Sequence, residues 1–241
     1  MNNKNNIKIN DNELLVKMKS IIFHDGDVRP VWVGPQPADT DVLEFKNYSK
    51  WANEHWGLYK AFITVTKDNS TILDLGCGVG FCTISLSDIF KNSKIYGYDL
   101  DSVSINFGVE YNSNENIKYI CEDIINNKLI KSDFIFLVET LEHIKHKDHY
   151  TLIDNCLEAL NKDGLLFIST PNEQTFSNGE HGHVGILTNE FFIKFKEKYH
   201  DNIVSIEFYD NTKLLDDNCD NYINKNEGSH FKIILRKQHA S

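Results

Sequence analysis

The chain has 241 residues and a formal net charge of −10, with 35 acidic and 25 basic residues. This length suits one α/β domain with an appended segment. The acidic balance opposes binding to a polyanion, so nucleic acid is disfavoured as a partner and a small molecule is expected. The five cysteines are odd in number and scattered, which predicts reduced thiols rather than a disulfide framework or a zinc ribbon.

The first twelve residues, M-N-N-K-N-N-I-K-I-N-D-N, are polar and contain no apolar stretch of the kind found in signal peptides. No apolar run approaches the roughly 18 residues that cross a bilayer. We therefore expect a cytoplasmic protein without a membrane partner. Nothing in the sequence indicates the oligomeric state.

Three regions follow from the distribution of apolar residues. Residues 1–12 are rich in Asn and Lys and predict a flexible tail. Residues 13–66 contain two stretches with helical spacing, 13–24 and 48–65, separated by a loop that holds three of the four prolines. Residues 67–241 form the expected main domain.

From residue 71 onward, short apolar runs alternate with helical segments. The runs cover residues 71–75, 94–98, 117–121, 133–138, 164–170, 202–209 and 230–236. This alternation predicts an α/β fold, a doubly wound and mostly parallel seven-stranded sheet covered by helices on both faces. The last two runs lack a helix between them, so the final strand is expected to be antiparallel. Residues 210–229 are acidic and predict a surface loop whose role the sequence does not indicate.

The most specific motif is T-I-L-D-L-G-C-G-V-G at residues 71–80. A buried strand ends at Leu75, glycines follow at Gly76, Gly78 and Gly80, and a helix starts directly afterwards. Such a loop brings backbone N–H groups close to an anionic ligand at a helix N-terminus. The loop does not match the dinucleotide fingerprint G-x-G-x-x-G, because Phe81 stands where its third glycine would be, and a pyrophosphate-binding loop is therefore disfavoured.

Acidic residues also end the next two strands. Asp99 follows the second strand, where a carboxylate can accept hydrogen bonds from two ribose hydroxyls. The alternative role is helix capping, which we assign to Asp101. Asp123 follows the third strand.

The Asp74 and G-x-G-x-G loop, with Asp99 and Asp123 in register, resembles the class I S-adenosylmethionine-dependent methyltransferases. In that family the loop packs against the methionine end of the cofactor, the acid at the Asp123 position binds the adenine amine, and N-terminal helices cap the cofactor. The resemblance implies that residues 13–66 form an N-terminal helical cap. It also implies these cofactor-binding residues: Asp74, Gly76, Cys77, Gly78, Asp99, Leu100, Asp123, Ile124 and Val138.

The fourth strand runs into E-T-L-E-H-I-K-H, which contains Glu139, Glu142, His143 and His146. If residues 139–144 are helical, the first three side chains lie on one face at the carboxyl end of a strand, where ligands bind in parallel sheets. The alternative is an ordinary helix start, where acids are favoured by the helix dipole. His146 lies a further turn away and is expected to be solvated.

A second segment after the fifth strand reads S-T-P-N at 169–172 and H-G-H at 181–183, followed by a helix that Thr188 caps. Together with E-x-x-E-H, this pattern resembles the metal-dependent 2′-O-methyltransferases that modify the 3′ ends of small RNAs. The resemblance implies a metal site of Glu139, Glu142, His143 and His183, with His181 as the competing ligand. Such a mixed set suits Mg²⁺, Mn²⁺, Fe²⁺ or Zn²⁺, since the ligand types alone do not select one ion, and we expect Mg²⁺ or Mn²⁺.

We therefore expect an S-adenosylmethionine-dependent O-methyltransferase that acts on a small hydroxylated metabolite, such as a sugar, with help from a divalent metal. If no metal binds, His143 or His181 is the expected general base. Two alternatives remain open: an RNA 3′-terminal 2′-O-methyltransferase, and a cofactor-binding partner subunit without catalytic activity.

Overall fold

The computed structural model describes residues 69–111, 114–171, 178, 183–210, 213–216 and 230–238. The predicted tail (1–12) and the predicted cap (13–66), with both of its helices, lie outside these residues. The longest helix in the described ranges has 14 residues, and none there combines the length and apolar character that crossing a membrane needs.

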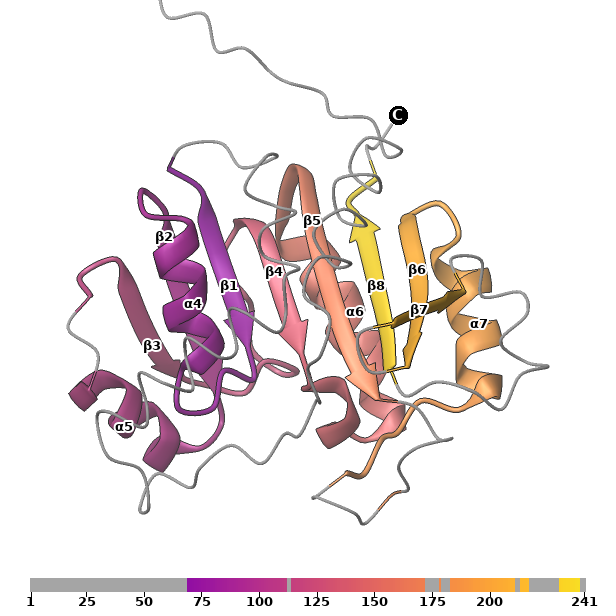
Figure 1. Cartoon of the computed structure of the whole chain (residues 1–241), viewed down its shortest axis with the longest axis horizontal. Coiled ribbons are helices and arrows are strands. Elements are labelled where there is room, and N and C mark those ends of the chain that lie inside the picture. The colour runs from indigo at the N-terminus through magenta and orange to yellow at the C-terminus, as the bar shows by residue number, and fades with distance from the viewer. Residues whose placement is uncertain are drawn as a thin grey trace, which may run out of the picture.

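Five strands from residues 71–171 pair in parallel and form one side of the sheet (Figure 1). They are β1 (Thr71–Leu75), β2 (Lys94–Asp99), β3 (Ile117–Cys121), β4 (Ser132–Val138) and β5 (Leu160–Pro171). Each one falls on a run that the sequence predicts as a strand, because β-branched and aromatic residues are concentrated in these runs.

The remaining strands are β6 (Ile203–Asp210), β7 (Lys213–Asp216) and β8 (His230–Arg236), which complete a sheet of order β3-β2-β1-β4-β5-β8-β6-β7. Strand β8 lies between β5 and β6 and is antiparallel to both, as expected for the last strand. The mostly parallel doubly wound sheet is thus confirmed. The eighth strand, β7, is a short edge strand within the segment that we expected to be a loop.

Helices cover both faces of the sheet. They are α4 (Phe81–Ile89), α5 (Ser102–Tyr111), α6 (His146–Ala159) and α7 (Asn189–Tyr199), with a short 3₁₀ turn, η2 (Leu141–His143), after β4. Residues alternate along each strand between two cores: Ile72 packs with Leu86 of α4, whereas Leu73 belongs to the core that contains Leu152 of α6 and Phe195 of α7. Burial on both faces explains the continuous apolar runs of β1, β4 and β5.

The parallel strands β1 to β5 all end at one edge of the sheet (Figure 1). Pairing sets residues from distant parts of the sequence beside one another there: Asp99 is opposite Cys121, and Val138 is opposite Ser169. This edge therefore collects the glycine loop, the acids after β2 and β3, and the cluster after β4.

Candidate functional site

The glycine loop turns sharply between β1 and α4. Gly76, Gly78 and Gly80 have φ angles of 75°, 53° and 95°, a region that L side chains rarely adopt. The N–H groups of Gly76 and Cys77 both donate to the carbonyl oxygen of Tyr98, at 2.8 and 2.9 Å. These bonds tie the loop to the end of β2, and the predicted strand-loop-helix geometry is confirmed.

The Asp99 carboxylate lies against the loop. Its Oδ2 accepts a hydrogen bond from the Gly78 N–H at 2.8 Å, and its Oδ1 accepts one from the Asp101 N–H at 2.9 Å. Asp101 accepts bonds from the N–H groups of Val103 and Ser104, each at 3.1 Å, so it caps α5 as predicted. Because each carboxylate oxygen has more than one lone pair, Asp99 can still accept from a ligand hydroxyl.

Asp74 lies on the buried side of the loop. Its side chain is 2% exposed and accepts a hydrogen bond of 2.6 Å from the Thr83 hydroxyl of α4. Burial raises the pKa of this carboxyl to about 7. Cys77 is also buried. Asp74 thus holds the end of β1, from which the loop starts, to α4. On the other side, a Cβ atom on Gly78 would meet no atom of the described residues within 4 Å, which leaves room for a ligand.

The other predicted cofactor contacts differ in their exposure. Asp123 accepts bonds from the Ile125 N–H at 2.8 Å and from the Asn126 side chain at 2.7 Å, which lower its pKa and order the turn after β3. Ile124 and Val138 are core residues, 9% and 6% exposed, whereas Leu100 is 72% exposed beside Asp99. Leu100 is therefore the apolar side chain of this set that offers the most surface to an adenine ring.

Residues 139–144 do not form the helical turn that would place Glu139, Glu142 and His143 on one helical face. Glu139 has a φ of 50°, and its N–H donates to the Ser169 carbonyl oxygen at 2.8 Å, which continues the pairing of β4 with β5. The 3₁₀ turn η2 starts only after Thr140, whose carbonyl oxygen accepts from the His143 N–H. The prediction that one helical face brings Glu139, Glu142 and His143 together is therefore wrong. A glutamate in the left-handed backbone region costs about 1–3 kcal/mol of conformational free energy, so it occurs where surrounding contacts enforce this conformation.

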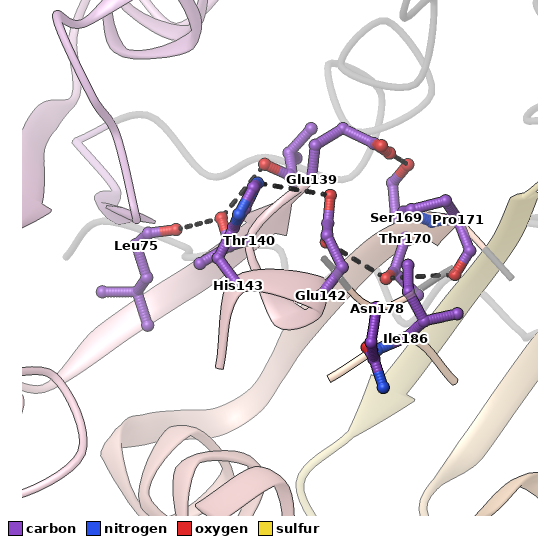
Figure 2. Close-up of polar contacts among 11 residues, drawn as sticks. Leu75, Glu139, Thr140, Glu142, His143, Ser169, Thr170, Pro171, Asn178 and Ile186 are labelled. Carbon is purple, nitrogen blue, oxygen red and sulfur yellow. Dashed lines mark hydrogen bonds and ion pairs between the residues drawn. The ribbon is translucent and has the colours of Figure 1, made fainter. Parts of the chain in front are cut away.

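Hydroxyl groups of β5 hold the two glutamates (Figure 2). Ser169 Oγ donates to Glu139 Oε1 at 2.5 Å, and Thr170 Oγ1 donates to Glu142 Oε2 at 3.1 Å. Glu142 is 1% exposed, and its pKa is raised well above the usual value, first by burial and then by the charge of Glu139. A buried carboxyl of this kind takes up either a proton or a cation.

Three of the four predicted metal ligands meet at this point. Glu142, His143 and His183 each offer a ligand atom, and these atoms lie within 4.8 Å of one another. The His143 and His183 rings are 5.1 Å apart between centroids, and His143 Nε2 is 4.0 Å from Glu142 Oε1. Glu139 stands beside this group, bonded to Ser169. His181, the competing ligand and alternative base, lies outside the described residues.

The side chains that support this cluster were not predicted from the sequence. His146 is half-buried rather than solvated, and its Nε2 lies 2.6 Å from the Ile186 carbonyl oxygen. Ser169 and Thr170 belong to the S-T-P-N motif, but their contact with the glutamates follows from the β4–β5 register, which pairs Val138 with Ser169. That register is set by the pairing of two strands about 30 residues apart, with a shift between Ser132 and Phe134, and neither run contains it by itself.

Comparison with known proteins agrees with this geometry. Residues 49–214 match the methyltransferase domain family. The chain belongs to this family. Its sheet is that of the class I S-adenosylmethionine-dependent methyltransferases, as the likeness to solved structures also indicates. The coclaurine N-methyltransferase structure with N-methylheliamine and SAH aligns with a TM-score of 0.56 at 17% identity, over 95% of this chain and 89% of that one.

Curated relatives of this methyltransferase-family chain differ in their acceptors. An (S)-coclaurine N-methyltransferase of Thalictrum flavum subsp. glaucum is 34% identical over 46% of this chain and 31% of its own length. A malonyl-[acyl-carrier protein] O-methyltransferase of Bacillus cereus is 28% identical over 54% of this chain and 50% of its own length. The chain thus spans half or less of either relative.

Proposed function

We propose that this protein transfers a methyl group from S-adenosylmethionine to a hydroxyl group of a small metabolite, such as a sugar, with the help of a divalent cation. The observation that carries the proposal concerns Glu142, His143 and His183, whose ligand atoms lie within 4.8 Å of one another. They lie at the edge of the sheet where β1 ends and the glycine loop begins.

Each residue around the loop has a different role in binding the cofactor. Gly78 offers an open backbone position for close approach, and Asp99 offers carboxylate oxygens for the ribose hydroxyls. Leu100 supplies exposed apolar surface next to that carboxylate. Asp74 acts indirectly, since its bond to Thr83 fixes the loop on α4.

The donor set fits a cation. Two imidazoles and one buried carboxylate suit Mn²⁺ and related divalent ions, and the carboxylate oxygens also suit Mg²⁺. When bound, such an ion lowers the pKa of an acceptor hydroxyl and orients it. Glu142 gains a counter-charge for its buried carboxylate, while His143, whose side chain is 46% exposed, faces the solvent from which an acceptor arrives.

The reaction is a displacement at carbon. An oxygen lone pair of the acceptor forms a bond to the methyl carbon, the bond from that carbon to sulfur breaks, and its electron pair stays on sulfur as S-adenosylhomocysteine. The acceptor proton leaves to solvent. The protein contributes mainly positioning, because the acceptor and the methyl group must meet in line. Relatives include O- and N-methyltransferases, and we favour oxygen because oxygen is the atom that a hard divalent ion binds.

The test measures transfer of a labelled methyl group from S-adenosylmethionine to a panel of hydroxylated metabolites, with Mn²⁺, with Mg²⁺ and with chelator. We expect turnover that requires a divalent ion and falls at least ~100-fold in Glu142→Ala. Glu158→Ala removes an exposed acid of α6 and serves as the matched control.

Other outcomes would contradict the proposal in distinct ways. Turnover that is unchanged by chelator and by Glu142→Ala would contradict the role of a metal ion in the reaction. Turnover on a short RNA duplex alone would favour the 2′-O-methyltransferase of small RNAs, which needs the same donors. Binding of S-adenosylhomocysteine without turnover on any acceptor would favour a partner subunit without catalytic activity.

A further inference from the structure

His146 is a histidine next to the cluster that the proposed reaction does not use. It begins α6 and is half-buried, and its Nε2 lies 2.6 Å from the carbonyl oxygen of Ile186. Because a carbonyl oxygen only accepts hydrogen bonds, the ring nitrogen must carry the proton and donate it. This bond crosses 40 residues of sequence.

The partner of His146 belongs to the segment that carries His183. Two N–H groups of this segment, those of Val184 and Gly185, donate to the Glu142 carbonyl oxygen at 2.9 Å each. The next N–H, that of Ile186, donates to Asn178 Oδ1 at 3.1 Å. Residues 183–187 are therefore attached to the η2 turn at one end and to α6 at the other.

The contact between this segment and the turn is too close for a side chain. A Cβ atom on Gly185 would lie 1.8 Å from the Ile144 carbonyl oxygen and 2.6 Å from His149 Nε2. The His146 bond thus adds to a close backbone approach that fixes the position of residues 183–187. A backbone carbonyl that loses such a partner while it stays buried is unfavourable, so the segment would shift to find another donor.

We infer that His146 is a positioning residue: by holding Ile186, it keeps His183 in reach of Glu142 and His143 and so sets the affinity of this site for a divalent cation. The inference rests on the proposed metal site. His146 itself touches no ligand of the site in the described contacts, and it acts through the backbone of residues 183–187. Outer residues that orient metal ligands typically change metal affinity about 10- to 100-fold when mutated.

The experiment titrates Mn²⁺ into the 241-residue protein without cofactor and measures the free ion by electron paramagnetic resonance. We expect His183→Ala to abolish specific binding and His146→Ala to weaken it about 10- to 100-fold. His146→Gln should restore most of the affinity, because the glutamine amide nitrogen occupies the place of Nε2 and can donate to Ile186. His146→Asn is too short and should not. Lys147→Ala, an exposed neighbour on α6, is the matched control and should bind as the wild type does.

A second measurement separates positioning from general loss of structure. Affinity for S-adenosylhomocysteine should stay within about twofold of wild type in every His146 variant, since the glycine loop is not touched. A parallel loss of both affinities would overturn the inference.

The failures of the inference and of the metal site are distinguishable. Wild-type affinity in His146→Ala, with loss in His183→Ala, overturns the role of His146 and leaves the metal site. Absence of Mn²⁺ binding in the wild type overturns both. If His146→Ala does not fold, the comparison of His146→Asn with His146→Gln decides, and equal affinities overturn the inference.

Discussion

The hydroxyl of Thr140 donates a hydrogen bond of 2.9 Å to the carbonyl oxygen of Leu75, and both groups are buried. This bond joins the last residue of β1 to the residue that precedes the η2 turn (Figure 2). The glycine loop and the acid cluster are thereby linked by one side chain. A substitution in the loop that displaces Thr140 should therefore also shift the residues of the cluster.

Gly76→Ala tests this link. A Cβ atom there would lie 2.3 Å from Thr140 Cγ2, and φ is +75°, so both sterics and backbone strain oppose it. We expect a loss of about 2–4 kcal/mol in the free energy of unfolding, with weakened affinity for both S-adenosylhomocysteine and Mn²⁺. Urea unfolding and the two titrations measure these effects.

Gly78→Ala is the matched control for that substitution. Its φ is +53°, but no atom of the described residues lies within 4 Å of the new Cβ. The loss of stability should be about 1 kcal/mol, from left-handed strain alone, with Mn²⁺ affinity unchanged and cofactor affinity reduced. Equal effects of the two substitutions on Mn²⁺ binding would disprove the link through Thr140.

Thr170→Val tests the support of Glu142. Valine keeps the shape of threonine but removes the hydroxyl that donates to Glu142 Oε2. We expect Mn²⁺ affinity to fall about 10-fold, because the buried carboxylate loses its orientation. Thr170→Ser keeps the hydroxyl and should retain most of the affinity, and a loss of the same size in both variants would argue against this role.

Sequence reasoning located the fold and most of the candidate site for physical reasons that can be stated. Strands buried on both faces, such as β1, β4 and β5, give uninterrupted apolar runs, and glycine adopts positive φ more readily than any other residue, so the parallel strands and the loop could be predicted. The local conformation after β4 could not be predicted from the sequence. Glu139 remains paired with β5 instead of starting a helix, and this depends on a contact with Ser169, 30 residues away.

The same limit applies to His146. Its neighbours in sequence are two lysines, Lys145 and Lys147, which suggest a solvated residue. Its actual partner, Ile186, comes from a loop whose path no local pattern predicts. Contacts between loops at the end of a sheet depend on side-chain register in three dimensions, and a single sequence does not supply it.

Glu142→Gln separates stability from metal binding. Burial and the nearby Glu139 raise the pKa of Glu142, so an ionised carboxylate here is costly without a cation. In chelator, we expect the variant to unfold at the same temperature as the wild type or a higher one. Added Mn²⁺ at about 100 times the dissociation constant should stabilise the wild type by about 2.7 kcal/mol and leave the variant unchanged. Differential scanning calorimetry with and without Mn²⁺ measures both, and equal stabilisation of the two proteins would exclude Glu142 as a ligand.

His149 makes the stability of the fold depend on pH. It is fully buried, its Nε2 lies 2.8 Å from the Ile144 carbonyl oxygen, and its Nδ1 has no hydrogen-bond partner among the described residues. Burial lowers its pKa from 6.5 to about 4. Between these two values the unfolded chain binds a proton that the folded chain does not, so the free energy of unfolding falls as the pH drops from 6.5 to about 4. The full contribution is about 3 kcal/mol.

His149→Gln isolates this contribution, because the glutamine amide can still donate to Ile144 but does not titrate. Asp74 acts in the opposite direction, since its raised pKa of about 7 makes its contribution decline as the pH rises, and it cancels in the comparison of the two proteins. Urea unfolding from about pH 8 to about pH 4.5 should show a constant difference between wild type and variant above about pH 7. Below pH 6.5 the free energy of unfolding should fall less in the variant than in the wild type, and the difference should reach about 2–3 kcal/mol at the lowest pH. A difference that stays constant over the whole range would mean that His149 takes up its proton in the folded state as readily as in the unfolded chain.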